Sequence, residues 1–104
     1  MAHVSDHVIQ SVERFLTAVR QVRRVEAAYL YGSQARGTAG EWSDIDLAVI
    51  SPDFQADRFQ ERLLLMRLAA RIDDRIEPHP FRPEEFSPTS PLASEIRRTG
   101  VRVA

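Results

Sequence analysis

The chain has no cysteine and no lysine among its 104 residues. The absence of cysteine excludes disulfide bridges and thiolate metal sites, and it fits a reducing compartment. All fourteen basic residues are arginines, so neither the phosphate-binding lysine of a P-loop nor a Schiff-base lysine is available. Enzyme classes that depend on either lysine are therefore excluded.

The sequence also has little net charge and no long apolar run. The net charge is −1, so no global positive field would attract nucleic acid, and we expect no direct nucleic-acid binding. No apolar run approaches the ~20 residues that a membrane span needs, and the N-terminus lacks the layout of a signal peptide. We therefore expect a cytoplasmic protein without membrane contact, in which local groups would have to bind any phosphate.

Length and composition suit one domain, expected over residues 1–104, because 43% hydrophobic and 28% charged residues are usual for globular proteins. Hydrophobic periodicity and turn residues predict helices over 5–24, 56–74 and 92–99, and strands over 25–31, 44–50, 75–81 and 101–104. This order predicts an α/β (α+β) fold, with helices packed on at least one face of a small mixed sheet.

The predicted helix over 56–74 has several apolar residues at helical spacing. Phe59, Leu63, Met66 and Ala70 share one face, with Leu64, Leu68 and Ile72 beside it. A helix of this length can return the chain to the same sheet, so that the strands before and after it belong together.

Two aspartates lie at the start of the second predicted strand. Because side chains alternate along a strand, Asp44 and Asp46 point to one face and Ile45 and Leu47 to the other. Two neighbouring carboxylates repel each other unless a positive charge lies between them, and magnesium prefers such hard oxygen ligands. Taken alone, the pattern indicates either a magnesium site or an ordinary solvated strand face.

Gly32 and Ser33 end the first predicted strand, where α/β proteins often have a ligand-binding loop. Glycine lets backbone N–H groups approach a phosphate closely, and the Ser33 hydroxyl can donate a hydrogen bond to it. Arg36 can supply positive charge to a triphosphate or a leaving pyrophosphate. Each feature alone also fits a simple turn with a surface arginine.

Together these features resemble a known signature. Gly32-Ser33, ten intervening residues and Asp44-x-Asp46 before an apolar run are similar to the DNA-polymerase-β-like nucleotidyltransferase superfamily. The segment GSQARGTAGEWSDIDLAVIS looks especially like the minimal nucleotidyltransferases. The resemblance implies that Asp44 and Asp46 hold Mg²⁺, two ions in all. It also implies that Gly32, Ser33 and Arg36 hold the triphosphate of ATP, the nucleotidyl donor.

The resemblance further implies a third carboxylate on a neighbouring strand. Glu77, in the strand after the 56–74 helix, is the candidate for a catalytic and metal-binding role, although the family more often has aspartate there. Asp73 and Asp74 are the competitors, but they fall at the helix end, where solvated charges are usual. Pro78 and Pro80 lack N–H groups on one side of this strand, which predicts that it lies at a sheet edge.

Three other residues near this signature have two interpretations each. His79 lies on the same face as Glu77 and either contacts a substrate or is merely hydrogen-bonded. Gln34 stands where the family frequently has arginine, so one phosphate contact is expected to be weaker. Trp42 could stack on a base, but we favour a loop tryptophan folded onto the domain.

The resemblance also suggests an acceptor. Minimal nucleotidyltransferases commonly act beside a separately encoded helical HEPN protein, a toxin. We therefore expect an antitoxin that transfers AMP from ATP to a hydroxyl, typically tyrosine, of a HEPN partner. One alternative is a nucleotidyltransferase-like antitoxin with little or no catalysis that neutralises its partner by contact. Another is transfer to a small molecule, with a partner protein completing the site. An oligomer or a hetero-complex is compatible with each.

Overall fold

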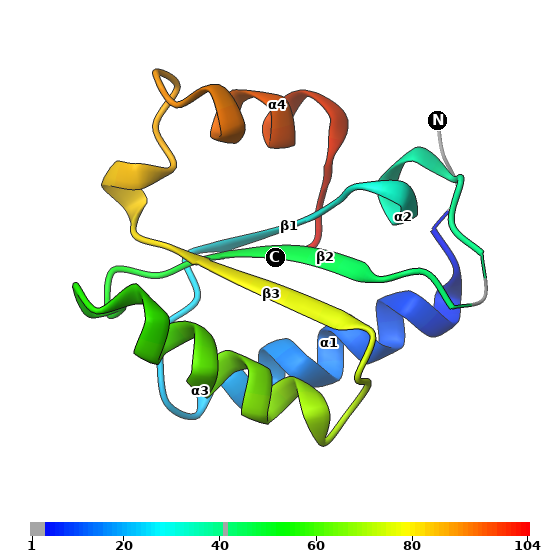
Figure 1. Ribbon diagram of the computed structural model, residues 1–104, viewed down its shortest axis with the longest axis horizontal. Coiled ribbons are helices and arrows are strands. Elements are labelled where there is room, and N and C mark those ends of the chain that lie inside the picture. The colour runs from blue at the N-terminus through cyan, green and yellow to red at the C-terminus, as the bar shows by residue number, and fades with distance from the viewer. Residues whose placement is uncertain (1–3, 41) are drawn as a thin grey trace.

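The computed structural model describes residues 4–40 and 42–104, and it has the mixed α/β fold that the sequence predicts (Figure 1). Along the chain the elements are α1 (Asp6–Arg20), β1 (Ala27–Tyr31), α2 (Ser33–Arg36), β2 (Ile45–Ile50), α3 (Arg58–Ala70), β3 (Ile76–Phe81), the 3₁₀ turn η1 (Pro83–Glu85), α4 (Pro91–Thr99) and β4 (Val101–Arg102). No helix in the described ranges is both long and apolar enough to cross a membrane.

The strands form one mixed sheet in the order β3-β2-β1-β4. β2 and β3 are parallel, and α3 is the crossover connection that a parallel pair requires; the other neighbours are antiparallel. β3 lies at the edge, as its two prolines predict. The carbonyl groups of β3 that accept hydrogen bonds from β2 belong to odd-numbered residues. For example, the Ile45 N–H donates to Arg75 O at 2.8 Å and the Ser51 N–H to Phe81 O at 2.9 Å. Pro78 and Pro80 therefore face the open edge, where a missing N–H costs no ladder bond.

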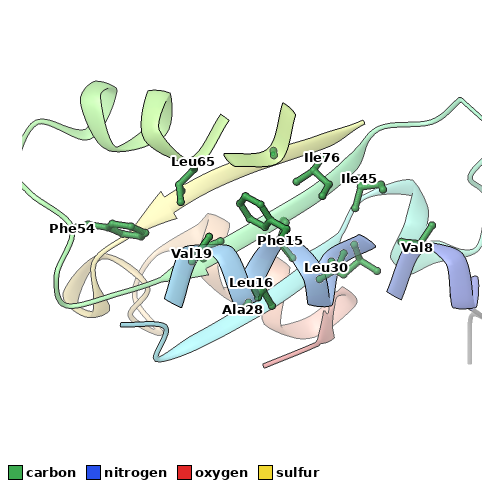
Figure 2. Packing of buried hydrophobic residues seen from close by; sticks show 14 residues of the cluster. Val8, Phe15, Leu16, Val19, Ala28, Leu30, Ile45, Phe54, Leu65 and Ile76 are labelled. Carbon is green, nitrogen blue, oxygen red and sulfur yellow. The ribbon is translucent and has the colours of Figure 1, made fainter. Parts of the chain in front are cut away.

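Helices cover both faces of the sheet. Figure 1 shows α1 and α3 on one side and α4 on the other. On the first side Phe15, Leu65 and Ile76 belong to the larger core, which lies between the two helices and the strands (Figure 2). On the second side a smaller cluster joins Ile50 of β2 to Phe86 after η1, and to buried residues of α4. The sheet is thus covered by two helices on the α1 and α3 face and only partly covered on the α4 face.

The face of α3 that carries Phe59, Leu63, Met66 and Ala70 is not its buried face. The buried residues of this helix are Glu61, Leu65 and Ala69, whereas Phe59 is 67% and Met66 44% exposed. The reason is an ion pair that periodicity does not reveal: Glu61 faces inward and accepts two hydrogen bonds from the Arg23 guanidinium, at 2.8 and 2.9 Å. A buried carboxylate is tolerated only with such a partner, and this pair sets the rotation of the helix.

This rotation can be tested by truncating adjacent side chains. Leu65 is fully buried, so Leu65→Ala should lower the free energy of unfolding by about 2–5 kcal/mol. Met66→Ala should change it by less than about 1 kcal/mol, because surface substitutions cost little. Urea denaturation measures both values, and a larger loss for Met66→Ala would contradict this orientation.

Asp73 joins the start of β3 to α1. It accepts a hydrogen bond from the Ser11 hydroxyl at 3.0 Å and pairs with the Arg75 guanidinium at 2.7 Å. These contacts, the arginine foremost, lower the pKa of Asp73 to about 2 from an ordinary 3.8. Asp73 is therefore a structural carboxylate on the α1 side of the molecule, which removes one competitor of Glu77.

The lowered pKa of Asp73 gives a pH dependence of stability. A carboxylate whose folded pKa is below its unfolded value stabilises the fold above the unfolded pKa, and this contribution is lost as the pH falls through the folded pKa. The wild-type midpoint of thermal unfolding should therefore drop between about pH 4 and pH 2. Asp73→Asn should be less stable at neutral pH and drop less over that interval. Asp74→Asn, at the exposed neighbour, should follow the wild type.

Candidate active site

Three side chains form a row across the sheet on its α4 face. The register pairs Asp46 of β2 with Tyr31 of β1 and with Glu77 of β3, so alternation brings all three to the same face. The next row holds Tyr29, Ala48 and His79. Asp46 and Glu77 stay half-exposed, whereas Ala48 is fully buried. The row of Asp46 is thus accessible to solvent at the end of the sheet where β1 ends and β2 begins.

Asp46 lies against the backbone of Gly32. A Cβ placed on Gly32 would lie 2.5 Å from Asp46 Oδ2, far inside any allowed contact, and Gly32 has a φ of +73°. Only glycine combines this left-handed conformation with the close approach. The end of β1, where α2 begins, is therefore held beside the carboxylate of Asp46.

The surroundings of Asp46 are balanced between opposite charges. Burial raises the pKa of Asp46, and the nearby carboxylate of Asp44 raises it further, while His79 and Arg36 oppose the rise. Asp44 itself is exposed and directly precedes β2. The structure thus brings Asp44, Asp46 and Arg36 into one electrostatic neighbourhood. A cation between the two aspartates would relieve both their repulsion and the cost of burying Asp46.

Glu77 is paired with an arginine that comes from the other side of the sheet. α3 packs on the opposite face, and Arg62 extends from it round the open edge of β3 to place a guanidinium nitrogen 3.5 Å from Glu77 Oε2. Both side chains are partly exposed, at 42% and 38%, so the pair is weak and can open. Glu77 is therefore in register with Asp46 but engaged by a charge that the sequence did not indicate.

The aromatic ring of Tyr31 in this row faces the imidazole of His79 in the next row. Tyr31 and His79 are tilted toward each other with ring centroids 6.0 Å apart. Burial and the charge of Asp46 raise the pKa of Tyr31 to about 12. Burial and the charge of Arg62 lower the pKa of His79. At neutral pH the row therefore carries a neutral phenol next to its carboxylates, and the lowered pKa of His79 favours the neutral imidazole in the next row.

The donor set suits a metal held jointly with a substrate. Within residues 4–40 and 42–104 no three His, Cys, Asp or Glu side chains gather as a ready-made ion site. Magnesium is usually bound by one or two carboxylates together with water and substrate phosphates, not by a complete protein cage. Asp44 and Asp46 fit that pattern, with the Gly32–Ser33 backbone and Arg36 next to them. Mg²⁺ thus fits the residues present.

α2 is a single helical turn that follows Gly32, and it contains a residue whose role the sequence did not reveal. Gln34 is buried, and its Nε2 lies 3.5 Å from the carbonyl oxygens of both Ser43 and Asp44. These long contacts place α2 beside the segment that leads into β2. Gln34 thus faces the protein interior, and only the folded chain reveals this.

Trp42 does not fold onto the domain as expected. Its side chain is 84% exposed and borders a groove with His7 and Arg14 of α1 and with Asp73. This groove lies on the α1 side, so the indole is not part of the row at Asp46. The expectation failed because burial of a loop residue depends on the path of the loop.

Another large hollow also lies away from the carboxylate row. A depression of about 570 Å³ at the opposite end of the sheet is lined by Arg20, Arg23 and Arg24, among others. Arg23 is bound to Glu61 and Arg24 to Asp53, each by a bidentate pair. Two of the three arginines are thus already neutralised, and Glu26 is the one carboxylate among the residues that line this depression.

Comparison with known proteins decides the family. A family model described as a nucleotidyltransferase domain matches residues 12–97. The chain belongs to the nucleotidyltransferase domain family. The matched residues include the whole carboxylate row, α2 and the Gly32 turn. No curated protein matches the chain in a sequence search.

Two solved structures share the nucleotidyltransferase fold. One is the crystal structure of a toxin–antitoxin with AMP-PNP, with a TM-score of 0.67 and 23% identity over 92% of this chain and 72% of that one. The other is a candidate nucleotidyltransferase from Sulfolobus solfataricus, with a TM-score of 0.52 and 20% identity over 94% of this chain and 86% of that one. At these identities the likeness establishes the fold.

The contact between Gly32 and Asp46 can be tested by adding one methyl group. Gly32→Ala must strain the backbone or displace the carboxylate, so we expect a loss of about 1–3 kcal/mol in the free energy of unfolding. Affinity for AMP-PNP with magnesium should fall about tenfold or more, because small displacements in such sites are costly. Gly40→Ala is the matched control, since its Cβ would lie 3.9 Å from Ser43 Oγ, an ordinary van der Waals contact. Wild-type stability and affinity in Gly32→Ala would refute the contact.

Proposed function

We propose that this nucleotidyltransferase is a magnesium-dependent antitoxin that transfers AMP from ATP to a tyrosine hydroxyl of a helical HEPN partner. The observation that carries the proposal is the position of Asp46, between the Gly32 turn on one side and Glu77 on the other. Membership of the nucleotidyltransferase family supports the reaction type. The likeness to a toxin–antitoxin crystallised with AMP-PNP supports the donor and the existence of a protein partner.

Each side of the row has its own task in this proposal. Gly32, Ser33 and Arg36 hold the triphosphate on the β1 side, through backbone N–H groups, a hydroxyl and a guanidinium. Asp44 and Asp46 hold Mg²⁺. The bound metal would neutralise the charge of the triphosphate. As two ions, it would stabilise both the attacking and the leaving oxygen.

The acceptor approaches from the β3 side, because the triphosphate occupies the β1 side. Its hydroxyl oxygen forms a bond to the α-phosphorus, the bond from that phosphorus to the bridging oxygen of the β-phosphate breaks, and pyrophosphate leaves. In this proposal Glu77 receives the hydroxyl proton once Arg62 has moved from it. The protein mainly supplies position and charge, as is general for phosphoryl and nucleotidyl transfer.

A second candidate is supported by the pair between Arg62 and Glu77. If this pair persists in the complex, the third carboxylate stays neutralised and catalysis is weak. The protein would then be a nucleotidyltransferase-like antitoxin that neutralises its partner by binding alone. Both candidates need a protein partner, and they differ in whether the nucleotide is transferred.

A transfer assay separates the two candidates. The protein is incubated with magnesium, ATP labelled on the α-phosphate and the product of the neighbouring gene. We expect label on a tyrosine of that product, located by mass spectrometry. Asp44→Ala/Asp46→Ala should reduce transfer by at least about 100-fold, since metal-held charge is worth several kcal/mol.

Asp74→Ala, at an exposed carboxylate outside the row, is the control and should transfer normally. Absence of transfer by the wild type, together with a double variant that still protects cells, would rule out the catalytic proposal and favour binding alone.

A further inference from the structure

The outer face of α3 is an apolar stripe in contact with solvent. Phe59, Leu63, Met66 and Ala70 follow each other at steps of four, three and four residues, which places them on one line along a helix. Phe59 is 67% and Met66 44% exposed, Ala70 is exposed and Leu63 half-buried. We call these four residues the α3 stripe. The other large exposed hydrophobic residues of the described chain are Val22, Trp42 and Leu92, none of which belongs to α3.

Arginines border the α3 stripe on both sides. At 100° per residue, Arg58 and Arg62 lie on the side toward β3, and Arg67 and Arg71 on the opposite side. Arg58 is paired with Glu85, and Arg62 with Glu77. Over the described part of the chain no acidic group pairs with Arg67 or Arg71. The stripe is therefore an apolar strip within a basic surface.

The α3 stripe leads directly to the candidate active site. A depression of about 350 Å³ lies between Phe59 and the edge strand β3, and it is lined by Arg58, Phe59, Arg62, His79, Pro80 and Phe81. Arg62 belongs to both, because it borders the stripe and contacts Glu77. A partner seated on the stripe thus reaches the β3 side of the row, where the acceptor hydroxyl is required.

The same edge disfavours a partner that binds as a strand. The backbone N–H and C=O groups of residues 76, 78 and 80 point to the open edge of β3. Pro78 and Pro80 have no N–H, and the Ile76 N–H is already bonded to Asp73 O at 3.1 Å. This edge of Ile76–Phe81 offers carbonyl groups but no free N–H, so an added strand would lack half of its ladder. An apolar helix face with residues at steps of three and four suits a groove or helix surface instead.

A second copy of this chain is a poor occupant. If two α3 stripes packed together around a two-fold axis, the same patch would face itself, and the arginines of one copy would meet those of the other. Like charges brought together in this way are repulsive. The basic border calls for acidic residues on the partner.

We propose that the α3 stripe is the docking surface for the acceptor protein. It would bind an amphipathic helix whose apolar face is flanked by aspartate and glutamate side chains. The partner's apolar residues cover Phe59 and Met66, and its carboxylates pair with Arg67 and Arg71 and compete for Arg58 and Arg62. An acidic group that draws Arg62 away would also release Glu77 for the acceptor. The identity of the partner rests on the proposed function; the surface and its chemistry do not.

The test compares a stripe variant with a matched variant elsewhere. Phe59→Ser/Met66→Ser makes the stripe polar at exposed positions, and Leu92→Ser does the same on α4, where Leu92 is 52% exposed. Isothermal titration with the purified product of the neighbouring gene gives the dissociation constant. We expect a rise of at least about tenfold for the stripe variant and none for Leu92→Ser. Unfolding midpoints and AMP-PNP affinity of both variants should match the wild type.

Charge is tested separately. Arg67→Glu/Arg71→Glu should weaken the same complex and remove much of its salt dependence. Arg14→Glu/Arg20→Glu, on the exposed face of α1, should not. A complex that keeps its dissociation constant in the stripe variant, or a wild type that does not bind the neighbouring product, would overturn the docking proposal. A stripe variant whose only effect is to dissociate a homo-oligomer would also overturn the docking proposal. Binding through the stripe without any transfer of label would instead sink the proposed function and leave the docking surface intact.

Discussion

The missing side chain at position 32 allows the two halves of the site to meet. With Gly32 at positive φ, β1 ends directly against the carboxylate of Asp46, and α2 starts there. The antiparallel pairing of β1 with β2 and the parallel pairing of β2 with β3 then place Tyr31, Asp46 and Glu77 in one row. A turn that can approach phosphate and a set of carboxylates thus become neighbours, although neither is a site alone.

Much of the fold could be predicted because its elements are short and their boundaries are marked by glycine, proline and capping residues. Even the edge position of β3 followed from Pro78 and Pro80. The orientation of α3 could not be predicted, since the run Leu63–Met66 puts apolar side chains almost all round the helix. The pair between Glu61 and Arg23, which are 38 residues apart, decided it. That decision left Phe59 and Met66 exposed, on a face bordered by arginines.

The candidate site was predictable to the extent that its residues lie in one continuous segment. The spacing from Gly32 to Asp46 identified the loop and both aspartates, and β3 brings Glu77 into register with Asp46, while Asp73 is engaged with Ser11 and Arg75. The roles of these residues in metal and nucleotide binding stay predictions. The contacts of Arg62 and Gln34 and the exposure of Trp42 depend on tertiary packing, which no local pattern encodes.

The central claim, that Gly32, Asp44 and Asp46 form one site for a nucleotide and its metal, can be tested most directly by crystallography with Mn²⁺ and AMP-PNP. Anomalous scattering locates the manganese independently of the protein atoms. The account predicts manganese on the carboxylates of Asp44 and Asp46, with the phosphates against the backbone of Gly32 and Ser33. Nucleotide in the depression lined by Arg20, Arg23 and Arg24, or manganese away from both aspartates, would contradict it.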